Sequence, residues 1–255
     1  MSDLVLSRAS AGVATLRLNR PDKRNALSSA LVSALKETLA RAVADPEVRV
    51  VALRGEGPDF CAGMDLGELA RSMELGALEG HADARRMGDL FVRLRRCPKP
   101  VVAVVQGRAL GGGCGLATAC DLVLVREDAE LGYTEVHLGF VPALVMAILR
   151  RKIPEGRAFE LLVRGDRVGA AEAHRIGLVN QVFAKATFDE DVDTYLAELA
   201  SRPPSAVSLI KELLYGVEGG SFEEAIERGA VVNTLARTTE ACREGVRRFL
   251  ERKRS

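Results

Sequence analysis

The sequence predicts one α/β domain that continues into a helical region at its C-terminal end. Two observations carry this prediction. Strand-like and helix-like segments alternate through the first half of the chain, and from Glu155 onward the apolar residues recur at helical spacing. At 255 residues the chain is long enough to bury a substantial single core. We divide it into a core of residues 1–190 and a helical region of residues 191–255.

The first half contains three strand-like segments that are rich in Val and Leu and close on Pro or Gly, at residues 12–21, 48–57 and 100–107. The second and third are apolar on both faces, as parallel strands are when both sides of the sheet are covered. Between the first two segments, Leu31, Leu35 and Leu39 recur at helical spacing within residues 28–45. This order predicts a β-α-β unit.

The C-terminal half contains helical segments at residues 155–165, 169–177, 188–203, 205–217 and 221–255. Ser221 and Glu224 have the spacing of a capping box, which predicts the start of a helix. The last segment carries two adjacent stripes, formed by Ala241, Gly245 and Phe249 and by Cys242, Val246 and Leu250. An apolar face of this kind needs a partner.

Charge and cysteine content narrow the classes of function. With 36 basic and 35 acidic side chains the net charge is +1, so no overall field favours nucleic acid or an anionic membrane. Five scattered cysteines without a C-x-x-C pair indicate reduced thiols, and we find neither a secretory leader nor an apolar run of membrane-spanning length. We expect a cytoplasmic protein that binds neither nucleic acid nor membrane. No set of His, Cys, Asp and Glu has metal-ligand spacing, which predicts no metal.

Two glycine-containing turns are the most informative segments. Residues 107–124, GRALGGGCGLATACDLVL, lead from a strand through three glycines into a helix, and residues 57–69, GPDFCAGMDLGEL, do the same after the preceding strand. Two such turns can each point one N–H at the same oxygen, which is the geometry of an oxyanion hole. The alternative is a close helix–strand crossing that uses the glycines for packing alone. The spacing fits neither a dinucleotide fingerprint nor a P-loop.

Five segments between residues 19 and 183 resemble, in the same order, the crotonase superfamily of enoyl-CoA hydratases and isomerases: NRPDKRNALS, FCAGMDLGEL, PKPVVAVVQGRALGGGCGLATACDLVL, GYTEVHLGFVP and GDRVGAAEAHRIGLVNQVF. The resemblance covers essentially the whole chain. It implies a crotonase-like ββα spiral with a helical C-terminal oligomerisation region, and chemistry on an acyl-CoA thioester. Coenzyme A then enters as part of the substrate, and no other cofactor is expected. The segment TEVHLGFVPALV is most similar to bacterial members described as methylglutaconyl-CoA hydratase-like.

The resemblance assigns roles residue by residue. It implies that the N–H groups of Met64 and Gly112 donate to the thioester oxygen and stabilise an enolate, and that Glu135 is the catalytic acid–base. The residues expected along CoA are Arg24, Ala26, Leu27, Ala62 and Asp65. The residues expected around the acyl group are Leu66, Gly115, Tyr133 and His137.

Gly115 departs from the familiar two-glutamate hydratases, which carry a carboxylate at this position. We favour hydration of an enoyl-CoA with Glu135 as the remaining acid–base. We hypothesise that a substrate carboxylate or an ordered water takes the space at Gly115, because small residues follow it. A single glutamate also suffices for a 1,3-proton shuttle, so Δ3-Δ2-enoyl-CoA isomerisation is the alternative. A third reading is a non-catalytic relative that binds CoA or RNA, but the chain lacks a lysine-rich surface helix.

Three residues of this region have simpler interpretations beside the functional ones. Cys114 is expected to be a small packing residue, because no nearby His could activate it. Tyr133 lines the acyl pocket or fills the core. His137 reaches the site if residues 135–137 are extended, whereas in a turn that starts a helix its side chain and that of Glu135 diverge.

The C-terminal helices of relatives pack into trimers, often paired as hexamers. Together with the apolar stripes of the last segment, the resemblance predicts a homotrimer or a hexamer that is a dimer of trimers.

Overall fold

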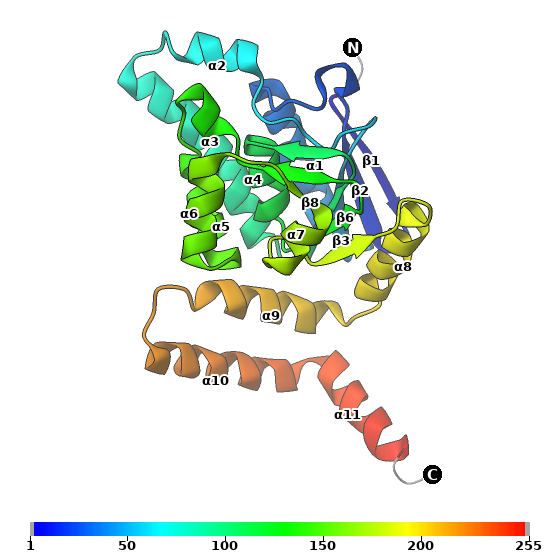
Figure 1. Ribbon diagram of the computed structural model, residues 1–255. Coiled ribbons are helices and arrows are strands. Elements are labelled where there is room, and N and C mark those ends of the chain that lie inside the picture. The colour runs from blue at the N-terminus through cyan, green and yellow to red at the C-terminus, as the bar shows by residue number, and fades with distance from the viewer. Residues whose placement is uncertain (1–2, 253–255) are drawn as a thin grey trace.

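The computed structural model describes residues 3–252 (Figure 1). Its strands are β1 (Val5–Ser10), β2 (Val13–Leu18), β3 (Val50–Gly55), β4 (Val101–Val105), β5 (Arg108–Leu110), β6 (Leu122–Arg126), β7 (Glu130–Gly132), β8 (Val168–Gly169) and β9 (Gln181–Phe183). Its α-helices are α1 (Ser29–Ala44), α2 (Leu66–Ser72), α3 (Ala77–Arg96), α4 (Gly112–Ala119), α5 (Ala143–Lys152), α6 (Glu155–Arg164), α7 (Ala170–Arg175), α8 (Phe188–Ala200), α9 (Pro204–Gly216), α10 (Phe222–Thr238) and α11 (Glu240–Arg252). Short 3-10 helices η1 (Pro21–Lys23) and η2 (Glu135–Leu138) follow β2 and β7.

The central sheet has the strand order β1-β2-β3-β4-β6-β9. Its neighbouring strands are parallel except for the pair β1 and β2. β3 and β4 are buried along their whole length, which confirms the parallel strands predicted from their two-sided apolar character. α1 connects β2 to β3, so the predicted β-α-β unit is present.

Different helices cover the two faces of this sheet (Figure 1). Val51 and Leu53 of β3 belong to the larger apolar cluster, which includes side chains of α1 and α3, whereas Val50 and Ala52 belong to a smaller cluster with α8. Alternation of side chains along a strand produces this division. α8 is therefore part of the core packing, and the boundary expected at residue 190 falls inside this helix.

A smaller sheet has the strand order β5-β7-β8. β5 and β7 are parallel, with Leu110 opposite Gly132, and β8 is antiparallel to β7. Strands of two or three residues are too short to show a period of two, so the sequence pattern did not predict them. Because β5 and β7 are parallel, the residues that follow each of these strands lie side by side at the same end of the small sheet.

A buried lysine attaches α9 to the core. Lys211 Nζ donates to Asp121 Oδ2 at 2.6 Å and to the carbonyl oxygens of Leu94 and Lys99 at 3.1 Å each. The Tyr215 hydroxyl donates to Asp121 Oδ1 at 2.7 Å. These partners compensate the charge of a lysine that is almost fully buried.

Helices α10 and α11 extend away from the core beneath α9 (Figure 1). The predicted capping box starts α10: the Glu224 N–H donates to Ser221 Oγ at 3.1 Å, and the Ser221 N–H donates to Glu224 Oε2 at 2.9 Å. The segment expected to run from residue 221 to 255 divides at Thr239, because its Oγ1 accepts the Cys242 N–H at 3.3 Å and caps a new helix. Nowhere in residues 3–252 is there a helix with the length and apolar content needed to cross a bilayer.

Candidate functional site

Three segments that carry the predicted catalytic groups run side by side in the same direction. Cys61 forms a parallel bridge with Ala109 in β5, and β5 pairs in parallel with β7. Met64, Gly112 and Glu135 follow these pairings by a few residues. They therefore meet at one end of the small sheet.

The N–H of Met64 is oriented through Leu27. The Leu27 N–H donates to the Gly63 carbonyl at 2.8 Å, and the Asp65 N–H donates to the Leu27 carbonyl at 3.0 Å. In a trans peptide the C=O and N–H bonds point in opposite directions. Because the Gly63 carbonyl points at Leu27, the Met64 N–H points to the other side, where Gly112 lies.

The glycines after β5 form the N-terminus of α4. The Gly111 N–H donates to the Gly132 carbonyl at 2.8 Å, and its backbone angles, φ 51° and ψ −127°, suit only glycine. Gly112 is the first residue of α4, so its N–H has no acceptor within the helix. A Cβ on Gly112 would lie 3.8 Å from the Met64 nitrogen, so a side chain there would crowd the approach to the Met64 N–H.

The N–H groups of Met64 and Gly112 are available to a ligand. Neither donates to another group within residues 3–252, and both residues are partly exposed. The N-terminus of α4 adds the positive end of a helix dipole. Two convergent donors of this kind stabilise an oxygen that gains negative charge during a reaction.

The carboxyl group of Glu135 lies against Gly111, next to the N-terminus of α4. Its Oε1 would be 3.4 Å from a Cβ placed on Gly111. Its Oε2 is buried without a hydrogen-bond partner in the described part of the chain. Burial raises the pKa of Glu135 above its ordinary value. A buried carboxylate oxygen without a partner costs stability, and the place of this group beside two available N–H groups fits an acid–base role.

The residues expected along CoA lie in two adjoining segments. The Ala62 N–H donates to the Arg24 carbonyl at 3.0 Å, and Leu27 pairs with the segment around Met64. The structure thus brings this set together, with Arg24 exposed, Ala26 and Ala62 half-buried and Leu27 buried. Their contact with CoA stays a prediction.

Asn25 supports this region from within, and no pattern in the sequence singles it out. Asn25 is fully buried with φ 57°, and its Nδ2 donates to the carbonyl oxygens of Glu56 and Asp59 at 2.8 and 2.9 Å. Its Oδ1 accepts the Arg20 N–H at 2.9 Å. Asn is among the few residue types that adopt positive φ readily, so an Asn within a charged turn was the available signal.

Gly115 serves close packing between helices. A Cβ at this position would lie 2.2 Å from Val145 Cγ1 and 3.7 Å from Phe91 Cζ, and both of these side chains are buried. α5 therefore fills the place that a side chain at 115 would take. The hypothesis that Gly115 leaves space for a substrate carboxylate or a water is wrong. At Gly113 the structure has the close helix–strand crossing that was the predicted alternative use of these glycines. A Cβ added to Gly113 would lie 2.3 Å from the Cys61 carbonyl oxygen.

The other residues expected around the acyl group take different positions. Tyr133 is fully buried and shares a hydrogen bond of 2.9 Å with Thr118 Oγ1, so it fills the core and does not line a pocket. His137 Nε2 lies 3.1 Å from the Gly165 carbonyl oxygen and points to the end of α6, as expected for a helical turn. This contact directs His137 to α6, not into the acyl site. Leu66 is exposed at the start of α2.

Cys114 is a packing residue, as the sequence predicted. It is fully buried beside the glycines. Burial raises the pKa of its thiol to about 12, so the nucleophilic thiolate is not formed at neutral pH.

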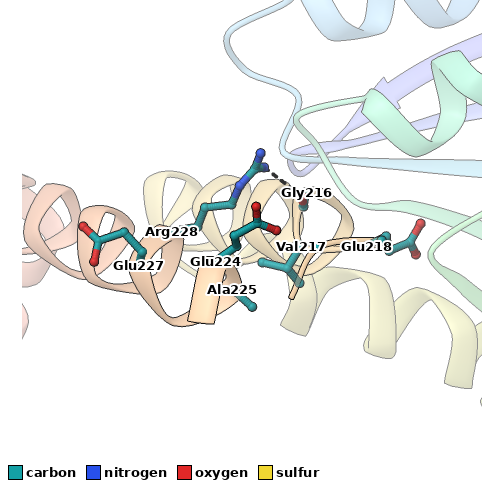
Figure 2. Close-up of a pocket in the computed structure, with 9 residues that line it drawn as sticks. Gly216, Val217, Glu218, Glu224, Ala225, Glu227 and Arg228 are labelled. Atoms are coloured by element: carbon teal, nitrogen blue, oxygen red, sulfur yellow. Dashed lines mark hydrogen bonds between the residues drawn. The ribbon is translucent and has the colours of Figure 1, made fainter. Parts of the chain in front are cut away.

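A hollow of about 490 Å³ lies elsewhere, at the turn between α9 and α10 (Figure 2). Arg228 crosses this turn, and its Nη1 donates to the Gly216 carbonyl at 2.8 Å. Glu218, Glu224 and Glu227 line the hollow, and none of the predicted site residues does. Its acidic lining does not suit a phosphate-bearing ligand, so we place the candidate site at Met64, Gly112 and Glu135.

The comparison with known families decides the membership of the chain. The model of the family described as enoyl-CoA hydratase/isomerase matches residues 8–255. The chain belongs to this family. Membership confirms the crotonase resemblance and the fold class that the sequence predicted.

Individual members agree in fold and differ in reaction. The chain is 43% identical over 241 residues to a Thermus thermophilus protein that is provisionally named an enoyl-CoA hydratase. The match covers 94% of this chain and 95% of that protein. It is 30% identical to 1,2-epoxyphenylacetyl-CoA isomerase of Escherichia coli, covering 99% and 97%. The crystal structure of an enoyl-CoA hydratase from Mycobacterium smegmatis has a TM-score of 0.93 at 33% identity, covering 98% and 97%. The family therefore leaves the exact reaction open.

Proposed function

We propose that this member of the enoyl-CoA hydratase/isomerase family hydrates an enoyl-CoA. The N–H groups of Met64 and Gly112 hold the thioester oxygen, and Glu135 moves the proton. The Glu135 carboxyl group carries this proposal, because its Oε2 is buried without a hydrogen-bond partner in residues 3–252 and the group lies beside two available N–H groups. Hydratase names among the similar proteins support it.

The proposed reaction uses one carboxylate twice. Ionised Glu135 takes a proton from water while the water oxygen bonds to Cβ, and the π electrons move onto the thioester oxygen. The N–H groups of Met64 and Gly112 stabilise the resulting enolate. Protonated Glu135 then gives the proton to Cα, and the thioester carbonyl re-forms. The product has gained one water, Glu135 has returned to its starting state, and the route requires no cofactor beyond the CoA of the substrate.

A second candidate function is Δ3-Δ2-enoyl-CoA isomerisation, and the packing at Gly115 favours it. Val145 fills the place where the two-glutamate hydratases carry their other carboxylate, so Glu135 acts alone. A single carboxylate can take a proton from Cα of a 3-enoyl-CoA and return it to Cγ. The description of the matching family, enoyl-CoA hydratase/isomerase, supports this candidate.

A panel of 2-enoyl-CoA and 3-enoyl-CoA thioesters separates the two functions. The conjugated 2-enoyl thioester absorbs in the ultraviolet, so hydration lowers the absorbance of 2-enoyl substrates and isomerisation raises that of 3-enoyl substrates. We expect the absorbance loss. A gain on 3-enoyl substrates without any loss on 2-enoyl substrates would assign the isomerase instead. Tight binding of CoA esters without turnover would point to a non-catalytic relative.

We also propose that the C-terminal helices assemble the protein into a homotrimer or a dimer of trimers. Large apolar side chains on α9, α10 and α11 are more than half exposed, among them Ile210, Leu214, Ile226, Val246 and Leu250. Sedimentation velocity at micromolar concentration should give the mass of three or six chains. Ile226→Glu should shift the protein toward smaller species, whereas Leu6→Glu on β1, also at an exposed apolar position, should not. A stable wild-type monomer would contradict this proposal.

The thiols fit a reducing compartment, and we propose the cytoplasm. All five cysteines are free. Cys61, Cys114 and Cys120 are fully buried, and burial raises the pKa of each thiol to about 12. Buried, protonated thiols of this kind are inert toward disulfide exchange.

A further inference from the structure

The guanidinium group of Arg20 joins the two segments that hold the Met64 N–H. Its Nη1 donates to the Ala26 carbonyl at 2.6 Å, and its Nη2 donates to Asp65 Oδ2 at 3.0 Å. The side chain is mostly buried, with 19% of its surface exposed. Its main chain is fixed as well, because the Arg20 N–H donates to Asn25 Oδ1 and the Arg20 carbonyl accepts the Asn25 N–H.

Two peptide groups connect this guanidinium to the candidate oxyanion hole. The Ala26 carbonyl belongs to the same peptide group as the Leu27 N–H, which donates to the Gly63 carbonyl at 2.8 Å. The Gly63 carbonyl belongs to the same peptide group as the Met64 N–H. Since C=O and N–H point in opposite directions across a trans peptide, one line of hydrogen bonds leads from Arg20 into the site.

We propose that Arg20 is a positioning residue of the oxyanion hole, which orients the Met64 N–H through two peptide groups and makes it a stronger donor to the thioester oxygen. This inference rests on the proposed function, because it takes Met64 as one of the two donors. Hydrogen bonds in a chain polarise one another, and a permanent cation at the far end increases that effect. The polarisation reaches the site without any contact between Arg20 and the substrate.

Asp65 opposes the charge of Arg20 and has a second structural contact. The hydrogen bond from Arg20 is the main cause that lowers the pKa of Asp65, so this carboxylate is ionised at neutral pH. Its Oδ1 accepts the N–H groups of Gly67 and Glu68 and thereby caps α2. If Arg20 served only to hold Asp65 and α2 in place, loss of either partner would have the same effect. If Arg20 polarises Met64, removing the charge of Asp65 leaves the cation stronger.

The test measures the thioester carbonyl stretch of a bound 2-enoyl-CoA by infrared difference spectroscopy, in a Glu135→Gln background that prevents turnover. Binding should shift the band to lower frequency. Arg20→Met should reduce this shift, Arg20→Gln should give an intermediate value, and Asp65→Asn, which keeps a capping side chain, should enlarge it. With Glu135 intact, Arg20→Met should lower kcat about tenfold, less than the about 10²–10³ expected for complete loss of a donor, with a smaller change in KM.

Arg17→Met is the matched control. Arg17 on β2 pairs with Glu56 at 3.2 Å and belongs to neither segment beside Met64, so its loss should leave the carbonyl band and kcat unchanged. An unshifted band in the Glu135→Gln parent would contradict the oxyanion hole and the proposed function. A shifted band that Arg20→Met leaves unchanged, or that Asp65→Asn reduces as much as Arg20→Met does, would overturn the role of Arg20 alone. If Arg20→Met does not fold, the comparison of Arg20→Lys with Arg20→Gln tests the role of Arg20. Lys keeps the positive charge, so Arg20→Lys should give the larger shift of the carbonyl band, and equal shifts would overturn the proposal.

Discussion

Glu135→Gln is expected to lower turnover of the enoyl-CoA substrate by at least about 10²-fold while CoA-ester binding changes little. Gln has nearly the shape of Glu but cannot take a proton from water or return it to Cα. Oε2 of Glu135 has no hydrogen-bond partner in residues 3–252, and His137 is engaged with the Gly165 carbonyl. Steady-state kcat and calorimetric binding of a substrate analogue measure the two effects separately.

The pH dependence provides the control for this prediction. Burial raises the pKa of Glu135, and the proposed reaction begins with the ionised form. The wild-type kcat/KM should therefore rise with pH through a value above the ordinary range of glutamate, and Glu135→Gln should lack this rise. Near-wild-type turnover of Glu135→Gln would mean that another group handles the proton.

The same raised pKa predicts a gain in stability for Glu135→Gln. The folded protein binds the proton of Glu135 more tightly than the unfolded chain does, so Glu135 destabilises the fold as pH rises through its folded pKa. The variant should therefore have a higher Tm than wild type at neutral pH. Below the ordinary pKa of glutamate this advantage should vanish, because the carboxyl group is then neutral in both states.

Gly115→Glu is expected to destabilise the fold and to leave hydration of a short, unbranched 2-enoyl-CoA no faster. A Cβ at residue 115 would meet Val145 Cγ1 at 2.2 Å, so α4 and α5 must separate or Val145 must change rotamer. Overpacking of this kind costs about 1–3 kcal/mol, and a carboxylate placed against Val145 and Phe91 adds a penalty for burying charge. Denaturant unfolding measures the loss, and the absorbance assay measures hydration.

Two further variants isolate the packing from the charge. Gly115→Ala alone should destabilise the fold, and adding Val145→Ala should recover part of the loss because it removes the methyl group in the way. Gly156→Ala in α6, where a Cβ meets nothing within 4 Å, should be neutral or stabilising by up to about 1 kcal/mol. A stable Gly115→Glu variant that hydrates the short substrate much faster would show that this position is a vacated catalytic site.

The packing at Gly115 shows which features of the structure could not be predicted from the sequence. β3 and β4 could be predicted because five or six consecutive buried residues leave a clear apolar run. The filling of Gly115 could not, because Val145 lies 30 positions further along the chain and reaches it only through the packing of α5 on α4. The contacts of Arg20 were equally hidden, since one of its acceptors is the main-chain carbonyl of Ala26, which any residue would supply.

The two donors at the centre of the candidate site are main-chain N–H groups, at Met64 and Gly112. A scan that replaces side chains one by one would therefore leave both donors in place, and would detect them only through the turns and glycines that orient them. In the proposed function, the donors that polarise the thioester are thus inherited with the fold, whereas the group proposed to move the proton is a single side chain that can change independently. Members of a family with this arrangement can change from one acyl-CoA reaction to another while the main-chain donors still bind the carbonyl oxygen.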